Sequence, residues 1–338
     1  PILSPNPILM NSKNKFKFKT VSFFATKYVS NLVESLSQLF KTNLDIETSR
    51  ITLNRCLTAY DVQENETKPT ELMFILIPHL LVNGVACMPP AGKYVIYQLE
   101  QLNDKGAGNL RPNFAFNALF CRLIQDSLVA FDYTPINVGY YPDACKCKVR
   151  VLIPPINMTA SASVNHVSVT LALERPDVLF YGSLNSRRNI IIGRLMNQLN
   201  AHGYSFRVVN GLFGQDLLDL VSRSKVVLNI HFYENSILES DRLHVALQFP
   251  NVHIVSERPT IRHETSAHLY EAHPRILFCN EIRDYANCDP AVNVTGELFE
   301  TCLKALASID KGKRDTGLDP VCQTINDMCT GVLTKLFL

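Results

Sequence analysis

The run Asp177-Val-Leu-Phe-Tyr-Gly-Ser183 is the first of three short apolar runs; the others are Lys225-Val-Val-Leu-Asn-Ile-His-Phe-Tyr233 and Val252-His-Ile-Val-Ser-Glu257. A helical pattern separates each run from the next. Apolar runs of this length between helical patterns predict strand–helix–strand units, which build a parallel sheet. Ligands of such sheets bind at the carboxyl ends of the strands. We therefore expect the residues that end these runs to form a ligand site.

The three predicted strand ends carry small, hydrogen-bonding groups of the kind that hold a nucleotide-like ligand. They are Gly182 and Ser183, Asn229 and His231, and Ser256 and Glu257, with Tyr233 close enough to stack or hydrogen-bond. A glycine lets a phosphate approach the backbone, and the helix predicted from Ser186 offers free N–H groups and a positive dipole end. Arg188 in its first turn can add a bidentate grip. A plain tight turn and a satisfied strand-end histidine remain the alternatives.

Ser236 and Glu239 form a capping-box pattern, which predicts that a helix begins at Ser236. That pattern alone could explain Glu239. Glu239 and Arg242 are three residues apart and would share a helix face, so that a carboxylate for sugar hydroxyls lies beside a guanidinium for phosphates. Glu239 and Asp241 would diverge by roughly 200° on a helix, and we therefore expect no metal there.

The rest of the chain predicts a second α/β unit before residue 155. Its signals are a strand at 16–24, a helix at 28–40, apolar strands at 71–78 and 94–102, and a helical pattern at 117–131. Pro154 and Pro155 interrupt regular structure, so we place a boundary there. The predicted organisation is a Rossmann-like domain at 1–154, a second at 155–320, and a last helix at 321–338.

Length and composition limit the class of protein. A chain of 338 residues with 46% hydrophobic and 19% charged residues predicts two globular domains. The formal net charge of +2 argues against a nucleic-acid partner. The basic stretch at 13–19 fits either a solvated strand face or peripheral contact with an anionic membrane. The 10 cysteines are scattered, which favours reduced thiols and a cytoplasmic location. We expect neither a signal peptide nor a transmembrane segment.

The three runs, together with Leu238-Glu-Ser-Asp-Arg242, resemble the carboxyl-terminal domain of group-1-like GT-B glycosyltransferases over residues 150–310. The resemblance implies two facing Rossmann-like domains with an interdomain cleft. It also implies a donor held by the second domain, an acceptor held by the first, no essential metal, and a last helix that crosses back to the first domain. Many members carry a second glutamate where this chain has Val245, beside His244. The chain therefore resembles a divergent member.

From the residues and this resemblance we expect a metal-independent hexosyl- or pentosyltransferase of glycan biosynthesis. It would move a sugar from a nucleoside-diphosphate-sugar donor to a glycan or other hydroxyl acceptor, with no further cofactor. Arg188 and Arg242 would neutralise the departing diphosphate, while Glu239, Asn229 and His231 would orient the donor. The candidate catalytic groups are His231 and, from the first domain, Glu100 or Asp132 as the base. A sugar-nucleotide epimerase or hydrolase, and a non-catalytic nucleotide- or glycan-binding partner, stay open as alternatives.

Overall fold

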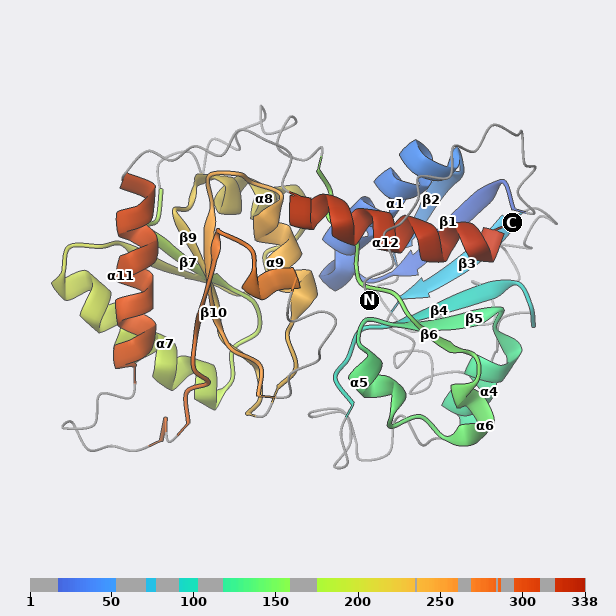
Figure 1. The fold of residues 1–338 in the computed structure, drawn as a ribbon, viewed down its shortest axis with the longest axis horizontal. Helices are drawn as coiled ribbons and strands as arrows, with labels where there is room; N and C mark the ends of the chain where they lie inside the picture. The colour runs from blue at the N-terminus through green and yellow to red at the C-terminus, as the bar shows by residue number, and fades with distance from the viewer. Residues whose placement is uncertain are drawn as a thin grey trace.

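The computed structural model describes residues 18–52, 71–76, 91–102, 118–158, 175–234, 236–260, 269–283, 285–286, 295–310 and 320–337. The described residues form two sheets, one in each half of the chain, and all their strand pairs are parallel. Helices lie against both sheets (Figure 1). The predicted α/β class with two Rossmann-like sheets is confirmed.

The first half contains a sheet of order β2-β1-β3-β4-β5-β6. Its elements are β1 (Thr20–Ala25), the 3-10 helix η1 (Lys27–Val29), α1 (Ser30–Leu44), β2 (Glu47–Thr52), β3 (Glu71–Leu76), β4 (Tyr94–Gln98), α4 (Ala118–Asp126), β5 (Val129–Asp132), α5 (Pro135–Val138), α6 (Asp143–Lys146) and β6 (Val149–Val151).

The second half contains a sheet of order β11-β10-β9-β7-β8. Its elements are β7 (Val178–Tyr181), α7 (Ser186–Ala201), β8 (Phe206–Val209), α8 (Gly214–Arg223), β9 (Val226–Asn229), α9 (Ser240–Leu247), β10 (His253–Glu257), β11 (Ile276–Cys279) and α11 (Gly296–Asp310). The last helix, α12 (Pro320–Phe337), follows.

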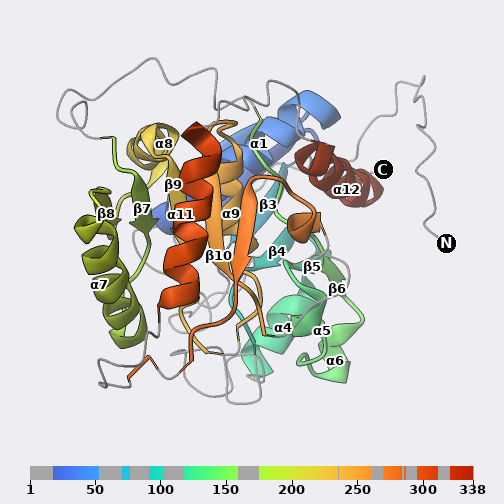
Figure 2. The ribbon, with the colours of Figure 1, turned by 60° about the vertical axis from the view of Figure 1, so that its left-hand side comes forward.

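The strands are apolar throughout because both faces of each sheet are covered. In β7, Val178 and Phe180 pack into one core with residues of α7 and α11, whereas Leu179 and Tyr181 pack into another with residues of α8 and α9. The two helix layers lie on opposite faces of this sheet in Figure 2. Successive side chains of a strand point to opposite faces, so a strand between two helix layers needs apolar residues at every position.

Helix α12 belongs to the cores of both halves. Its Cys322 and Ile325 pack in a core of the second sheet, and its Cys329 and Leu333 pack in a core of the first. Figure 1 shows α12 running from between the lobes across the first sheet. Among the described helices, none combines the length and apolar character that a bilayer span requires. The domain boundaries at 154 and 320 stay a prediction.

In each sheet the strand order reverses at the first strand, and this places a crevice at the carboxyl ends of the strands. The chain leaves β1 for β2 on one side and then reaches β3 on the other, and it does the same from β7 to β8 and β9. Such a reversal separates the loops that follow neighbouring strands, and ligands bind in the gap. The segments that follow β1 and β7 therefore lie where a ligand site is expected.

Two local expectations were wrong. The helical pattern at 117–131 combines α4 with β5, because the apolar run of β5 follows the helix after a break of two residues and periodicity alone does not separate them. Ser127 Oγ donates to Ile124 O at this break. Helix α9 begins at Ser240 rather than at Ser236, whose Oγ donates to Tyr233 O instead. The capping box does not form, and Glu239 is free for other partners.

Candidate functional site

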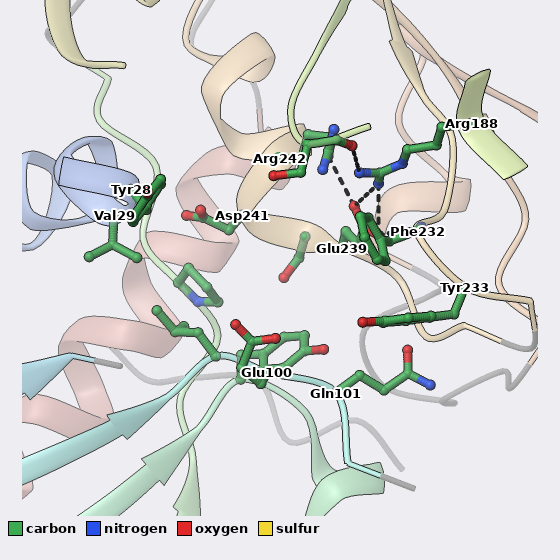
Figure 3. A pocket seen from close by; sticks show the side chains of 15 residues that line it. Tyr28, Val29, Glu100, Gln101, Arg188, Phe232, Tyr233, Glu239, Asp241 and Arg242 are labelled. Atoms are coloured by element: carbon green, nitrogen blue, oxygen red, sulfur yellow. Dashed lines mark hydrogen bonds and ion pairs between the residues drawn. The ribbon is translucent and has the colours of Figure 1, made fainter. Parts of the chain in front are cut away.

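A cavity of about 500 Å³ lies between the two sheets. Its lining comes from both halves of the chain and includes these residues of the predicted site: Glu100, Ser183, Arg188, Tyr233, Glu239 and Arg242. Figure 3 shows Glu100 and Gln101 on one side of the cavity, facing the arginines and Glu239 on the other. The residues that follow β4, β7 and β9 thus meet in one cleft.

Glu239 is shared by two arginines. Its Oε2 lies 3.0 Å from Arg188 Nη2 and 3.0 Å from Arg242 Nε. Its Oε1 accepts the backbone N–H of Phe232 at 3.0 Å. Burial alone would raise the pKa of Glu239, but the Arg242 and Arg188 guanidinium groups outweigh it and hold that pKa at about 2. Glu239 is therefore ionised at all ordinary pH values.

Arg188 is held almost completely inside the protein, with 1% of its surface exposed. Its Nε and Nη2 donate to Ile230 O at 2.9 and 2.6 Å, and its Nη1 donates to Ser183 O at 2.8 Å. Burial lowers its pKa to about 10, so that the group stays charged near neutral pH. Its backbone N–H donates to Oδ1 of Asn185, the N-cap of α7, at 2.8 Å. The predicted helix start at Ser186 is confirmed.

Gly182 is required by the neighbouring Arg242. Its φ of +126° favours glycine, and a Cβ at this position would clash with the Arg242 guanidinium, whose Nη2 would lie 2.9 Å away. Arg242 Nη1 donates to Tyr181 O, and Tyr181 Oη returns a hydrogen bond to Arg242 O at 2.6 Å. The glycine therefore lets the arginine lie flat against the end of β7.

Two other carboxyl groups of the lining, Asp241 of α9 and Glu100 after β4, have raised pKa values. Burial raises the pKa of Asp241 to about 6, although the nearby Arg242 opposes the shift. Burial also raises the pKa of Glu100, and repulsion from Glu239 adds to it. The Glu100 side chain is exposed to the cleft, but protein surrounds the cleft closely enough to desolvate the carboxylate. The site therefore contains one strongly ionised carboxylate and two that accept protons more readily than usual.

Six of the predicted residues lie outside the cavity lining that the described residues form: Asp132, Gly182, Asn229, His231, Ser256 and Glu257. Asn229, His231, Ser256 and Glu257 have no exposed surface. Glu257 pairs with Arg187 at 2.5 Å, and accepts the N–H groups of His231 at 2.7 Å and Ile282 at 2.8 Å. Asn229 Nδ2 donates to Ser256 Oγ at 3.0 Å. These groups tie together the ends of β9 and β10.

Burial lowers the pKa of His231, so its imidazole is mainly neutral near pH 7. Of the two expected bases from the first half, Glu100 lines the cavity, whereas Asp132 is fully buried outside that lining. Burial raises the pKa of Asp132 to about 7, against the hydrogen bonds from Thr134, Tyr141 and Asn137 that favour its ionised form. Asp132 thus binds protein groups rather than facing the cleft.

Other lining residues had not been assigned to the site from sequence: Tyr28, Tyr133, Phe232 and Asp241. Tyr28 follows β1 and Tyr133 follows β5, so a search of every strand end would have included them. Tyr28 is 64% exposed, and its ring meets the Phe213 ring edge-on at 5.1 Å between centroids. Among the described residues, no cluster of three or more His, Cys, Asp or Glu could hold a metal ion.

Comparison with known proteins establishes the fold. No family model matches the sequence, and no curated protein matches it significantly. The structure of HepE from Anabaena in complex with UDP and glucose has a TM-score of 0.50 and 11% identity, and the match covers 94% of this chain and 100% of that one. An α-glucosyltransferase in complex with UDP and a 13-mer DNA containing an HMU base gives 0.48 and 9%, with 94% and 95% covered. The likeness to HepE shows a common fold, and the chain has the expected GT-B architecture.

Replacement of Gly182 tests whether Arg242 needs the space beside it. We expect Gly182→Ala to lower the free energy of unfolding by about 2–4 kcal/mol, because strain at a positive φ adds to displacement of Arg242 from Glu239. Gly203→Ala is the control: its φ is +81°, and no atom of the described residues lies within 4 Å of an added Cβ. Urea unfolding measures both losses. Equal losses for the two variants would contradict the role assigned to Gly182.

Proposed function

We propose that this protein is a glycosyltransferase that moves a sugar from a nucleoside-diphosphate-sugar donor to a hydroxyl acceptor bound in the same cleft. The observation that carries the proposal is the Arg188–Glu239–Arg242 cluster at the strand ends of the second sheet, in a cavity that the first sheet closes. HepE, which shares the fold, is bound to UDP and glucose in its structure, and this supports a nucleotide-sugar ligand here.

The donor would lie against the second half of the chain. Arg242 keeps 16% of its side chain exposed and would offer its charge to a diphosphate. Arg188 is buried and would add to the positive electrostatic potential at the same place. Glu239 would accept hydrogen bonds from donor hydroxyls, and Ser183 and Tyr233 would contact the same ligand. Negative charge develops on the leaving diphosphate in the transition state, and fixed guanidinium groups lower the barrier by stabilising it.

The buried residues that were expected to bind the donor would act by fixing this arrangement. Glu257 holds the backbone N–H of His231 and the guanidinium of Arg187, and Arg187 Nη1 also donates to His231 O at 2.8 Å. Asn229 and Ser256 join β9 to β10. Phe232, whose N–H reaches Glu239, directly follows His231. We propose that these buried residues fix the positions of the residues that contact the donor.

The acceptor would lie against the first half of the chain, from which Tyr28, Tyr133 and Glu100 line the cavity. Aromatic faces pack against the apolar faces of sugars, and carboxylates accept hydrogen bonds from hydroxyl groups. We propose a glycan or other hydroxylated acceptor and Glu100 as its base. The raised pKa of Glu100 makes it a stronger base than an exposed glutamate, because a base works best when its pKa approaches the working pH.

A panel of nucleoside-diphosphate sugars tests this function without a known acceptor. We expect one donor to raise the melting temperature and to be hydrolysed slowly, because water can replace the acceptor in a transferase. Conversion of a donor to its epimer would instead indicate an epimerase. Thermal stabilisation without turnover would indicate a binding module. Absence of both stabilisation and turnover across the panel would contradict the proposal.

Arg242→Ala should weaken binding of the donor that stabilises the wild type by about 10–100-fold, the usual loss for a charge-assisted phosphate contact worth roughly 1.5–3 kcal/mol. Isothermal titration calorimetry measures the change. The matched control is Arg258→Ala, because Arg258 pairs with Glu271 away from this cavity. An unchanged dissociation constant in Arg242→Ala, or an equal loss in the control, would remove Arg242 from the donor site.

Donor affinity should rise as the pH falls from 8 to 5. Asp241 has a pKa of about 6, so its carboxylate takes up a proton below that pH and no longer repels the diphosphate. We expect a gain of about three- to tenfold, equivalent to roughly 1 kcal/mol of charge repulsion. A nucleoside-diphosphate sugar keeps its charge over this range, unlike a free diphosphate. Asp241→Asn should bind tightly throughout, and a slope that survives in this variant would assign the effect to another group.

A further inference from the structure

The side-chain amide of Asn137 forms two hydrogen bonds to the turn that contains Glu100. Its Nδ2 donates to Glu100 O at 2.8 Å, and its Oδ1 accepts the N–H of Leu102 at 2.8 Å. Asn137 is fully buried in α5, 35 residues beyond Leu102 in the chain. One amide thus bonds to both ends of the segment Glu100–Leu102, which begins two residues after the end of β4.

The orientation of this amide is determined by its neighbours. The second hydrogen of Nδ2 points to Asp132, whose Oδ1 lies 3.0 Å away, so that both hydrogens have acceptors. The opposite orientation would place the amide oxygen against two acceptor oxygens and the NH₂ group against the Leu102 N–H. Such a flip would leave the Leu102 N–H, the Asn137 amide oxygen and the Asn137 NH₂ group without hydrogen bonds, and each would cost about 1–3 kcal/mol.

Asp132 holds Asn137 in turn. Besides the Asn137 amide, its carboxylate accepts the Thr134 N–H at 3.0 Å and the Tyr141 hydroxyl at 2.8 Å. Asp132 ends β5 and lies opposite Gln98 of β4 in the sheet register. Gln98 Nε2 also reaches Glu100 O, at 3.4 Å. The end of β5 and the start of α5 therefore form a rigid, buried polar support under the turn.

The turn that this support holds forms part of the cleft. Glu100 and Gln101 line the cavity, and Gln101 Oε1 accepts the N–H of Ile237 from the other half of the chain at 3.3 Å. Ile237 lies two residues before Glu239. A shift of the turn would move Glu100 relative to the Arg188–Glu239–Arg242 cluster, and misplacement of a reacting group by about 1 Å can cost about 100-fold in rate.

We infer that Asp132 and Asn137 are positioning residues, which fix the Glu100–Leu102 turn so that Glu100 faces the donor cluster across the cleft. The inference rests on the proposed glycosyl transfer for its effect on rate, but the grip on the turn can be measured without any turnover. It gives Asp132 a different task from that of a base in contact with the acceptor.

The test is Asn137→Ala, with Asn326→Ala as the matched control. Asn326 uses the same pair of amide atoms on one backbone unit, accepting from Ile156 N at 2.8 Å and donating to Ile156 O at 2.9 Å. We expect the Leu102 amide to exchange with deuterium at least about tenfold faster in Asn137→Ala, because its acceptor is gone. In Asn326→Ala, whose loss of stability should be similar, Leu102 exchange should match the wild type.

Turnover provides the second readout. Donor hydrolysis or transfer by Asn137→Ala should fall about 10–100-fold in kcat, while the donor dissociation constant stays within about twofold, because the turn lies on the acceptor side. Tyr141→Phe removes the hydroxyl bond to Asp132 but leaves both bonds from Asn137 to the turn, so its kcat should stay within about threefold of the wild type.

The outcomes separate this inference from the proposed function. Unchanged Leu102 exchange in a folded Asn137→Ala variant, or an unchanged kcat, would overturn the positioning role. Should Asn137→Ala not fold, Asp132→Asn replaces it: this variant keeps the volume, and we expect an intermediate increase in Leu102 exchange. A wild type without turnover on any donor would contradict the proposed function, yet faster Leu102 exchange in the variant would still establish the grip on the turn.

Discussion

One side of the cleft depends on one carboxylate that three separate segments share. Arg188 comes from α7, Arg242 comes from α9, and the Phe232 N–H comes from the segment after β9; all of them meet at Glu239. Arg188 is buried, so it needs this negative charge, and loss of a partner from a buried pair typically costs about 3–5 kcal/mol. The same interaction therefore holds the ends of the strands together and leaves the three side chains with a net positive charge beside the cavity. Glu239 therefore contributes both to the stability of the fold and to the charge of the cleft.

The carboxyl groups of the cleft differ in how far neighbouring positive charges compensate their burial. Glu239 lies between guanidinium groups and has a lowered pKa, whereas Glu100 and Asp241 are desolvated with little compensation and have raised values. Carboxyl groups whose environments push their pKa values apart can take different tasks in one site. A strongly ionised group suits permanent hydrogen bonding, and a group that titrates closer to neutrality suits proton transfer. This division follows from the placement of Arg188 and Arg242, because both guanidinium groups pair with Glu239.

The sequence predicted the fold well, because buried parallel strands read as continuous apolar runs and each strand end is marked by polar residues. Arg188, Glu239 and Arg242 were found for the same reason: they lie close in sequence to those ends.

Burial of polar groups left no such signal. Asn229 and Glu257 end their strands just as Ser183 follows its own, and nothing local reveals that their side chains are enclosed. Asp241 was considered only as a metal ligand, because the helix was expected to begin four residues before its observed start at Ser240. The partners of Asp132, and the link between Asn137 and Glu100, depend on contacts between distant segments and are not visible in any local pattern.

The return of the last helix limits how the two halves can move. The chain passes between them once near Ile156 and again along α12, and the amide of Asn326 joins these passages through two hydrogen bonds. Two bodies connected along one side by neighbouring tethers rotate about that side far more easily than they slide or separate. Opening of the cleft should accordingly be a hinge rotation about this paired crossing. The edge of the cleft away from this crossing would then open the most, while residues next to the crossing would move the least.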